Sequence, residues 1–195
     1  MRMPSVIIGG VVAAFLGACT TAAPQSPQSS IAVARQVTLN LPASSELTLT
    51  VDATQLLTID HGRERHMLQA HVELRPGKVV LVVMDILGAF LFSIKYDKEI
   101  IVIDTMEGWP QTFPLEPVLA DFLLAYLPWE LVSSNLSGGH FERSTDDRIR
   151  RVLRHSQAVM EIRRSHAEPW LGAVEIAHLE RGYLMTVETV SYSSE

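Results

Sequence analysis

The sequence predicts a mainly β domain with few helices, in which one antiparallel, strongly curved sheet of about ten or eleven strands surrounds a single good helix. Apolar and polar residues alternate over most of the chain after residue 37, which is the period of half-buried strands. Turn signals such as Arg75-Pro76-Gly77-Lys78 and Glu107-Gly108-Trp109-Pro110 separate these stretches at hairpin spacing. The period changes to that of a helix over one stretch, residues 115–126.

The strands are expected in the following order. Leu47, Leu49 and Val51 alternate with polar residues, and 79–86 is a nearly continuous apolar run, so we expect that strand to be covered on both faces. The other strands are expected at about residues 65–74, 90–96, 100–103, 148–155, 157–164, 171–180 and 182–191.

The expected helix has one apolar face, because its large apolar residues are spaced three and four apart. Pro117 is tolerated in the first turn, and Pro128 ends the helix. The helix is either a plug packed on the sheet or a lid over a lipid cavity; the pattern favours the plug, since any apolar stripe needs a partner surface. The residues of this face are Leu115, Val118, Leu119, Phe122, Leu123 and Tyr126.

The N-terminus has the features of a secretory signal: Arg2, an apolar run at 6–16 and small residues at 17–18. Cys19, the only cysteine, follows Leu-Gly-Ala, and this resembles the lipobox of bacterial lipoproteins. The resemblance implies cleavage before Cys19 and acylation of that residue. Thr20 stands where inner-membrane retention usually needs Asp, which favours the outer membrane. The alternatives are an ordinary signal peptide and a single membrane helix, although the run is shorter than the roughly 20 residues a span needs.

These features predict three parts: a signal peptide at 1–18, a lipidated cysteine with a flexible tether at 19–36, and one β domain at 37–195. The tether is rich in Ala, Ser, Thr, Gln and Pro, a composition that cannot bury enough apolar surface to fold alone. The formal net charge of −6 provides no basic footprint, so we expect no nucleic-acid partner.

Catalytic signatures are missing from the sequence. It has no Gly-x-Ser-x-Gly elbow, no phosphate loop and no dinucleotide fingerprint. His61, His66 and His71 recur every five residues, so neighbouring members would point to opposite faces of a strand. Asp85 and Asp104 stand at strand ends, where acids usually meet water. We therefore predict no catalytic residue, metal or cofactor.

Two further features leave alternatives open. An Arg-rich segment at 143–164 could bind anionic groups or an acidic partner, but a solvated outer face interleaved with Asp146, Asp147 and Glu161 is favoured. The turn at 86–90 is apolar throughout, whereas hairpin tips are normally polar. It is either a tip that enters a membrane or a partner, or a strand bend buried in the core.

The order of parts resembles the LolB-like outer-membrane lipoproteins, and most closely an uncharacterised branch often encoded beside aryl-polyene and ketoacyl-synthase genes. The resemblance rests on the lipobox, the tether, the strand meander, the turn Ile86-Leu87-Gly88 and the helix that ends in Leu127-Pro128. It implies an open, incomplete β-barrel capped by helix, as in LolB and LolA. LolB-like proteins take acylated lipoproteins from the periplasmic carrier LolA and place them in the outer membrane. In their Pro-Leu-Gly loop the Leu is important for insertion; Leu87 and Gly88 match that loop here, and Ile86 replaces the Pro.

The resemblance thus implies a non-enzymatic protein on the periplasmic face of the outer membrane, with acyl chains as ligand and a LolA-like carrier as a possible partner. Leu87, Gly88 and Phe90 would form the membrane or partner loop, and the helix face would line or cap the cavity. The alternative is a membrane-tethered scaffold of an envelope or polyene-lipid system, which a tightly packed interior would favour. A lipid hydrolase or transferase is a third hypothesis, which requires histidines and acids that converge in a pocket.

Overall fold

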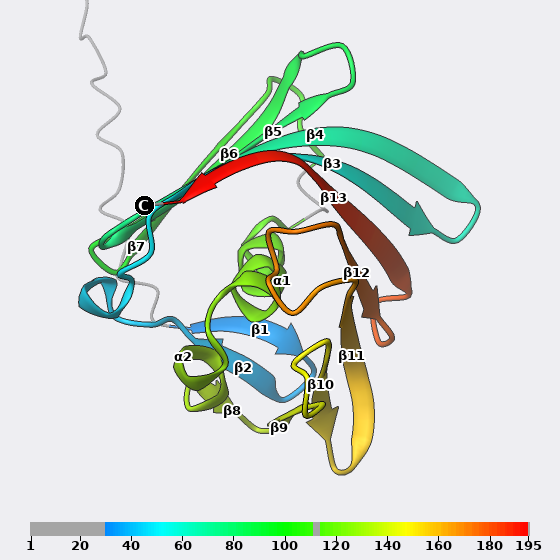
Figure 1. Ribbon diagram of the computed structural model, residues 1–195. Coiled ribbons are helices and arrows are strands. Elements are labelled where there is room, and N and C mark those ends of the chain that lie inside the picture. The colour runs from blue at the N-terminus through cyan, green and yellow to red at the C-terminus, as the bar shows by residue number, and fades with distance from the viewer. Residues whose placement is uncertain (1–29, 111–113, 195) are drawn as a thin grey trace, which may run out of the picture.

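A ten-stranded antiparallel sheet forms most of the molecule in a computed structural model, which describes residues 30–110 and 114–194. Its spatial order is β7-β6-β5-β4-β3-β13-β12-β11-β10-β9, so the last strand of the chain joins two meanders (Figure 1). The first meander is β3 (Val51–His61), β4 (Glu64–Arg75), β5 (Lys78–Asp85), β6 (Phe90–Asp97) and β7 (Ile100–Thr105). The second is β9 (His140–Arg143), β10 (Ile149–Arg154), β11 (Gln157–Arg164), β12 (Ala173–His178) and β13 (Tyr183–Ser194).

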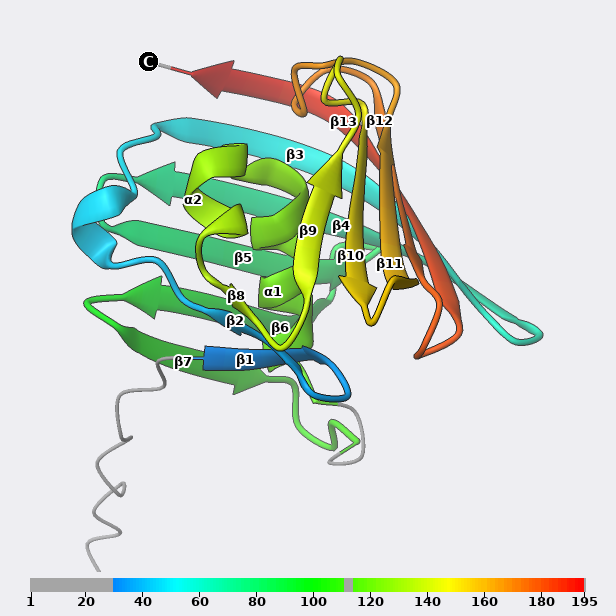
Figure 2. The same ribbon diagram turned by 90° about the horizontal axis from the view of Figure 1, so that it is seen from below.

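The sheet is strongly curved and does not close. Strands β9 to β12 run across the direction of β3 to β7 in the view from below (Figure 2). The end strands β7 and β9 each pair with one neighbour only, among the strands that the structure describes. The predicted fold class, an open antiparallel β structure with few helices, is therefore confirmed.

A smaller sheet lies on the open side. It consists of β1 (Ser30–Ala34), β2 (Val37–Asn40) and the two-residue β8 (Leu136–Ser137). Ile31 and Val33 of β1 are buried, so the folded part begins by Ser30, earlier than the expected boundary at residue 37. Two alternating apolar residues within a polar stretch are too short a pattern to indicate a strand by themselves.

The helix α1 (Glu116–Tyr126) lies between the two sheets, with the large sheet arched over it and β1 and β2 on its other side (Figure 1). A short helix α2 (Trp129–Ser133) follows Pro128, and a 3-10 turn η1 (Ser44–Glu46) precedes β3. In the part of the chain that is described, neither helix is long and apolar enough to cross a membrane.

Two local expectations differ from the structure. Residues 47–50 are not a strand, although Leu47 is buried and its carbonyl accepts the Gly77 N–H at 2.9 Å. Strand β5 is not covered on both faces, because Val79, Leu81 and Val83 are buried while the alternate residues are only half-buried. Valine and methionine are tolerated on that half-exposed outer face, which makes the run look fully buried in sequence.

Candidate functional site

The hollow of the sheet is filled by α1. Leu115, Leu119, Phe122, Leu123 and Tyr126 are buried, as expected for the helix face, and Val118 is half-buried. The opposite side is buried as well, since Ala120, Leu124 and Ala125 have no exposed surface. A helix that is apolar all round is buried all round. The helix is therefore a plug rather than a lid over a vacant cavity.

One small pocket lies beside the C-terminal end of α1. Within residues 30–110 and 114–194, the hollow retains a cavity of about 20 Å³ beside Leu47, Leu74 and Leu127, close to the minimum for one water molecule. A depression of about 330 Å³ lies on the outer face of the sheet, lined by Glu161, Glu175 and Leu184, among others. The buried helix α1 therefore occupies the space that the lid interpretation leaves vacant.

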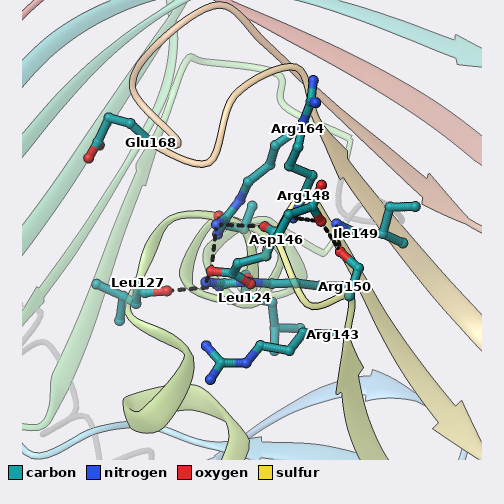
Figure 3. A network of polar contacts seen from close by, with 12 residues as sticks. Leu124, Leu127, Arg143, Asp146, Arg148, Ile149, Arg150, Arg164 and Glu168 are labelled. Carbon is teal, nitrogen blue, oxygen red and sulfur yellow. Dashed lines mark hydrogen bonds and ion pairs between the residues drawn. The ribbon is translucent and has the colours of Figure 1, made fainter.

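Two buried arginines hold the C-terminal end of α1 (Figure 3). Arg150 of β10 donates to the carbonyl oxygens of Leu124 at 3.0 Å and Leu127 at 2.8 Å. Arg164 of β11 donates to the carbonyl oxygen of Ala125. These are among the carbonyls that a helix end leaves without an internal partner, and cations are favoured there by the helix dipole.

Asp147 forms an ion pair with both arginines. Its carboxylate receives two hydrogen bonds from Arg150, at 2.9 and 2.8 Å, and one from Arg164 at 3.2 Å. Burial raises the pKa of Asp147, but the hydrogen bonds and charges of the two arginines together lower it below its usual value. Burial, with the charge of Arg150, lowers the pKa of Arg164 to about 10, so Arg164 remains a cation at neutral pH. We call Arg150, Arg164 and Asp147 the clamp.

The Arg-rich segment therefore divides between two roles. Arg150 and Arg164 point inward, in phase with the buried residues of their strands, which the sequence analysis did not anticipate. Arg151 and Arg163 lie on the outer face and each pair with Glu161 at 2.5 Å. The expectation of a solvated face interleaved with acids holds for these outer arginines and fails for the clamp.

A buried carboxyl group lies in the middle of α1. Asp121 is 2% exposed, and its Oδ2 accepts a hydrogen bond from the Tyr183 hydroxyl on β13. Burial raises the pKa of Asp121 to about 7, although the Tyr183 hydrogen bond and the charge of Arg181 oppose the shift. The helix is thus fixed by polar contacts at its centre as well as at its end.

An aromatic cluster closes one side of the hollow. Trp170, from the loop between β11 and β12, lies 4.6 Å from Tyr126 and 6.3 Å from Phe122 between ring centroids. Phe122 and Tyr126 stack on each other at 5.0 Å along α1. The sequence analysis missed Trp170, because an isolated tryptophan in a loop belongs to no periodic pattern.

The apolar turn at 86–90, called the tip below, is exposed. The exposed fractions are 88% for Leu87, 63% for Ile86 and 42% for Phe90. The Asp85 carboxylate accepts the N–H groups of Leu87 and Ala89, each at 2.8 Å. Gly88 adopts φ +85°, which favours glycine, and its N–H donates to the Asp85 carbonyl. Of the two interpretations of this turn, the structure excludes the buried strand bend.

Asp85 accordingly has a structural role in the tip, while the other expected acid, Asp104, is exposed on the end strand β7. His61, His66 and His71 are all exposed. Three or more His, Cys, Asp or Glu side chains that could hold a metal ion gather nowhere in the described ranges. Cys19 lies outside the described residues.

One solved structure similar to this chain is the crystal structure of a LolA superfamily protein from Nitrosomonas europaea. The two share 9% sequence identity with a TM-score of 0.43, over 75% of this chain and 86% of that one. No curated protein matches the chain. Residues 52–191, which contain nearly the whole large sheet together with α1, the clamp and the tip, match the family described as "Protein of unknown function (DUF3261)". The chain belongs to the DUF3261 family.

Proposed function

We propose that this protein is a non-enzymatic lipoprotein of the outer membrane that binds acyl chains and helps to place lipoproteins or lipids in that membrane. Cys19 would carry the lipid anchor, and the domain would face the periplasm. A LolA-like carrier would be the partner that delivers the acylated cargo. The chemistry needs no cofactor, because acyl chains only move between apolar environments.

The observation that carries this proposal is the exposed tip. A rigid turn that exposes three large apolar side chains to water is unfavourable, and it becomes favourable when these side chains contact a membrane or an apolar partner surface. Burial of such a side chain in an acyl layer contributes roughly 1.5–3 kcal/mol. The Asp85 hydrogen bonds hold the tip in its protruding form, which supplies the rigidity that a proline at position 86 would otherwise give.

A transfer assay tests the proposal. The soluble version without residues 1–19 is loaded with an acylated lipoprotein and mixed with vesicles of outer-membrane phospholipids. We expect Leu87→Glu to abolish transfer and to leave cargo binding intact. The matched control is Leu179→Glu, because Leu179 is 58% exposed in another turn, after β12. Equal transfer by both variants would show that the tip has no such role.

A second function, a membrane-tethered scaffold, is favoured by the filled hollow. A scaffold needs only a stable core and a docking surface, and α1 provides such a core. The two functions are distinguished by mass spectrometry of organic extracts from the purified protein. Stoichiometric acyl chains support the first function, while their absence together with a stable protein partner supports the second.

A further inference from the structure

The loop between β11 and β12 is attached to the hollow through one side chain. Residues 165–168 and 171–172 are exposed, and Trp170 is the only buried residue of this eight-residue loop. Leu171 N–H donates to Glu168 O at 3.1 Å, and Ala173 N–H donates to Ser165 Oγ at 2.8 Å. Arg148 donates to Ser165 O, and Thr189 N–H donates to Gly172 O at 3.2 Å, so these two bonds to neighbouring segments lie at the ends of the loop. Figure 1 shows the loop, in orange, lying over α1.

The helix, in contrast, is costly to move. Displacement of α1 would separate the clamp arginines from the carbonyls of Leu124, Ala125 and Leu127, and would leave buried donors without acceptors. It would also break the contact between Asp121 and Tyr183. None of these contacts involves residues 165–172.

We propose that the place occupied by the Trp170 indole is the entry subsite for an acyl chain, and that the ligand displaces this indole while α1 stays in position. The inference rests on the proposed function, since it names the point of entry for the same ligand. The site is lined by the rings of Phe122 and Tyr126, which an extended methylene chain can contact in place of the indole. The acyl chain makes apolar contacts there similar to those of the indole that it displaces. The exchange therefore loses little net hydrophobic free energy.

The environment of Trp170 reports on this exchange. The chain has three tryptophans, so Trp109→Phe with Trp129→Phe leaves Trp170 as the single emitter. This protein, without residues 1–19 but with every residue the structure describes, is titrated with palmitate below its micellar concentration. We expect its emission maximum to shift to longer wavelength and acrylamide quenching to increase several-fold at saturation. A control with Trp129 as the single tryptophan, stacked on Phe141 at 4.6 Å, should not change.

A substitution gives a second measurement. Trp170→Ala removes the competitor for the subsite, so palmitate should bind at least about tenfold more tightly by calorimetry, as expected when a minor open form becomes dominant. Leu171→Ala, in the same loop but exposed, should change the affinity less than about twofold. If Trp170→Ala does not fold, Trp170→Leu is used in its place.

The outcomes separate the two proposals. Palmitate binding with unchanged Trp170 emission overturns the entry subsite and leaves acyl binding intact. Failure of every version to bind palmitate, together with purified protein free of acyl chains, overturns the acyl-binding function and the subsite with it.

Discussion

The buried carboxyl group of Asp121 makes the stability of the fold depend on pH, and Asp121→Asn should remove this dependence. The side chain has almost no contact with water, and burial raises its pKa from 3.8 to about 7. In the unfolded chain the same group loses its proton near pH 4. Between these two pH values the folded state holds one proton more than the unfolded state, so stability falls as the pH rises.

The size of the effect follows from the shift. A difference of about three pKa units, at 1.36 kcal/mol each, corresponds to roughly 4 kcal/mol of stability lost between pH 4 and pH 7. Asparagine has a similar shape, can accept the Tyr183 hydrogen bond and carries no charge at any pH. The free energy of unfolding of the variant minus that of the wild type should therefore rise by up to about 4 kcal/mol from pH 4 to pH 8.

The assay is urea unfolding of both proteins at several pH values from 4 to 8. At each pH the free energy of unfolding of the wild type is subtracted from that of the variant, because the contributions of the other titrating groups cancel in this difference. One of these is His178, whose pKa is lowered by burial, so that its protonation destabilises the fold as the pH falls. Asp104→Asn, at an exposed position of strand β7, controls for the loss of one negative charge. Parallel curves for the wild type and Asp121→Asn would refute the argument that burial keeps this carboxyl protonated.

Three further predictions concern the clamp, the tip and the anchor. Arg150→Met should destabilise the fold by about 3–5 kcal/mol in urea unfolding, because the buried carbonyls of Leu124 and Leu127 lose their donor and Asp147 loses two hydrogen bonds. The outward-facing Arg151→Met should cost under about 1 kcal/mol. Asp85→Ala should cost about 1 kcal/mol and should speed hydrogen exchange at the tip amides; unchanged protection there would show that the carboxylate does not hold the turn. Cys19→Ser should abolish labelling by a fatty-acid analogue in cells, and continued labelling would disprove the anchor.

Period-two and helical patterns were sufficient to predict the sheet and the helix, because they report which side chains must leave water. Strands β4 to β7, strands β10 to β13 and α1 lie close to their expected ranges for this reason. The range of β3 and the short strands β1, β2, β8 and β9 were not predicted. The sequence analysis expected one apolar face of α1, and the structure buries Ala120, Leu124 and Ala125 on its other side as well. A lid would have required a polar outer face, which the helix lacks.

The positions of the clamp and of Trp170 could not be predicted, because their partners come from distant stretches of the sequence. Arg150 shares the inward phase of Val152, but six other arginines surround it in the segment, and only strand pairing shows which ones face the helix. Trp170 has no partner nearby in sequence; Phe122 and Tyr126 come from a helix more than forty residues earlier. The exposure of the tip was likewise undecided until the Asp85 turn was seen.

The polar contacts of α1 have a specific consequence for the hollow. A helix that is apolar on all sides has little preference for one rotation about its axis, because any face can be buried equally well. Buried charges are a poor source of stability compared with apolar side chains of similar volume, but they can specify a single arrangement. Asp121 fixes the rotation of α1 through Tyr183, and Arg150 fixes its depth through the last carbonyls. The aromatic pair Phe122 and Tyr126 is thereby held toward Trp170, so a chain that enters there meets a preformed apolar wall and only the loop has to move.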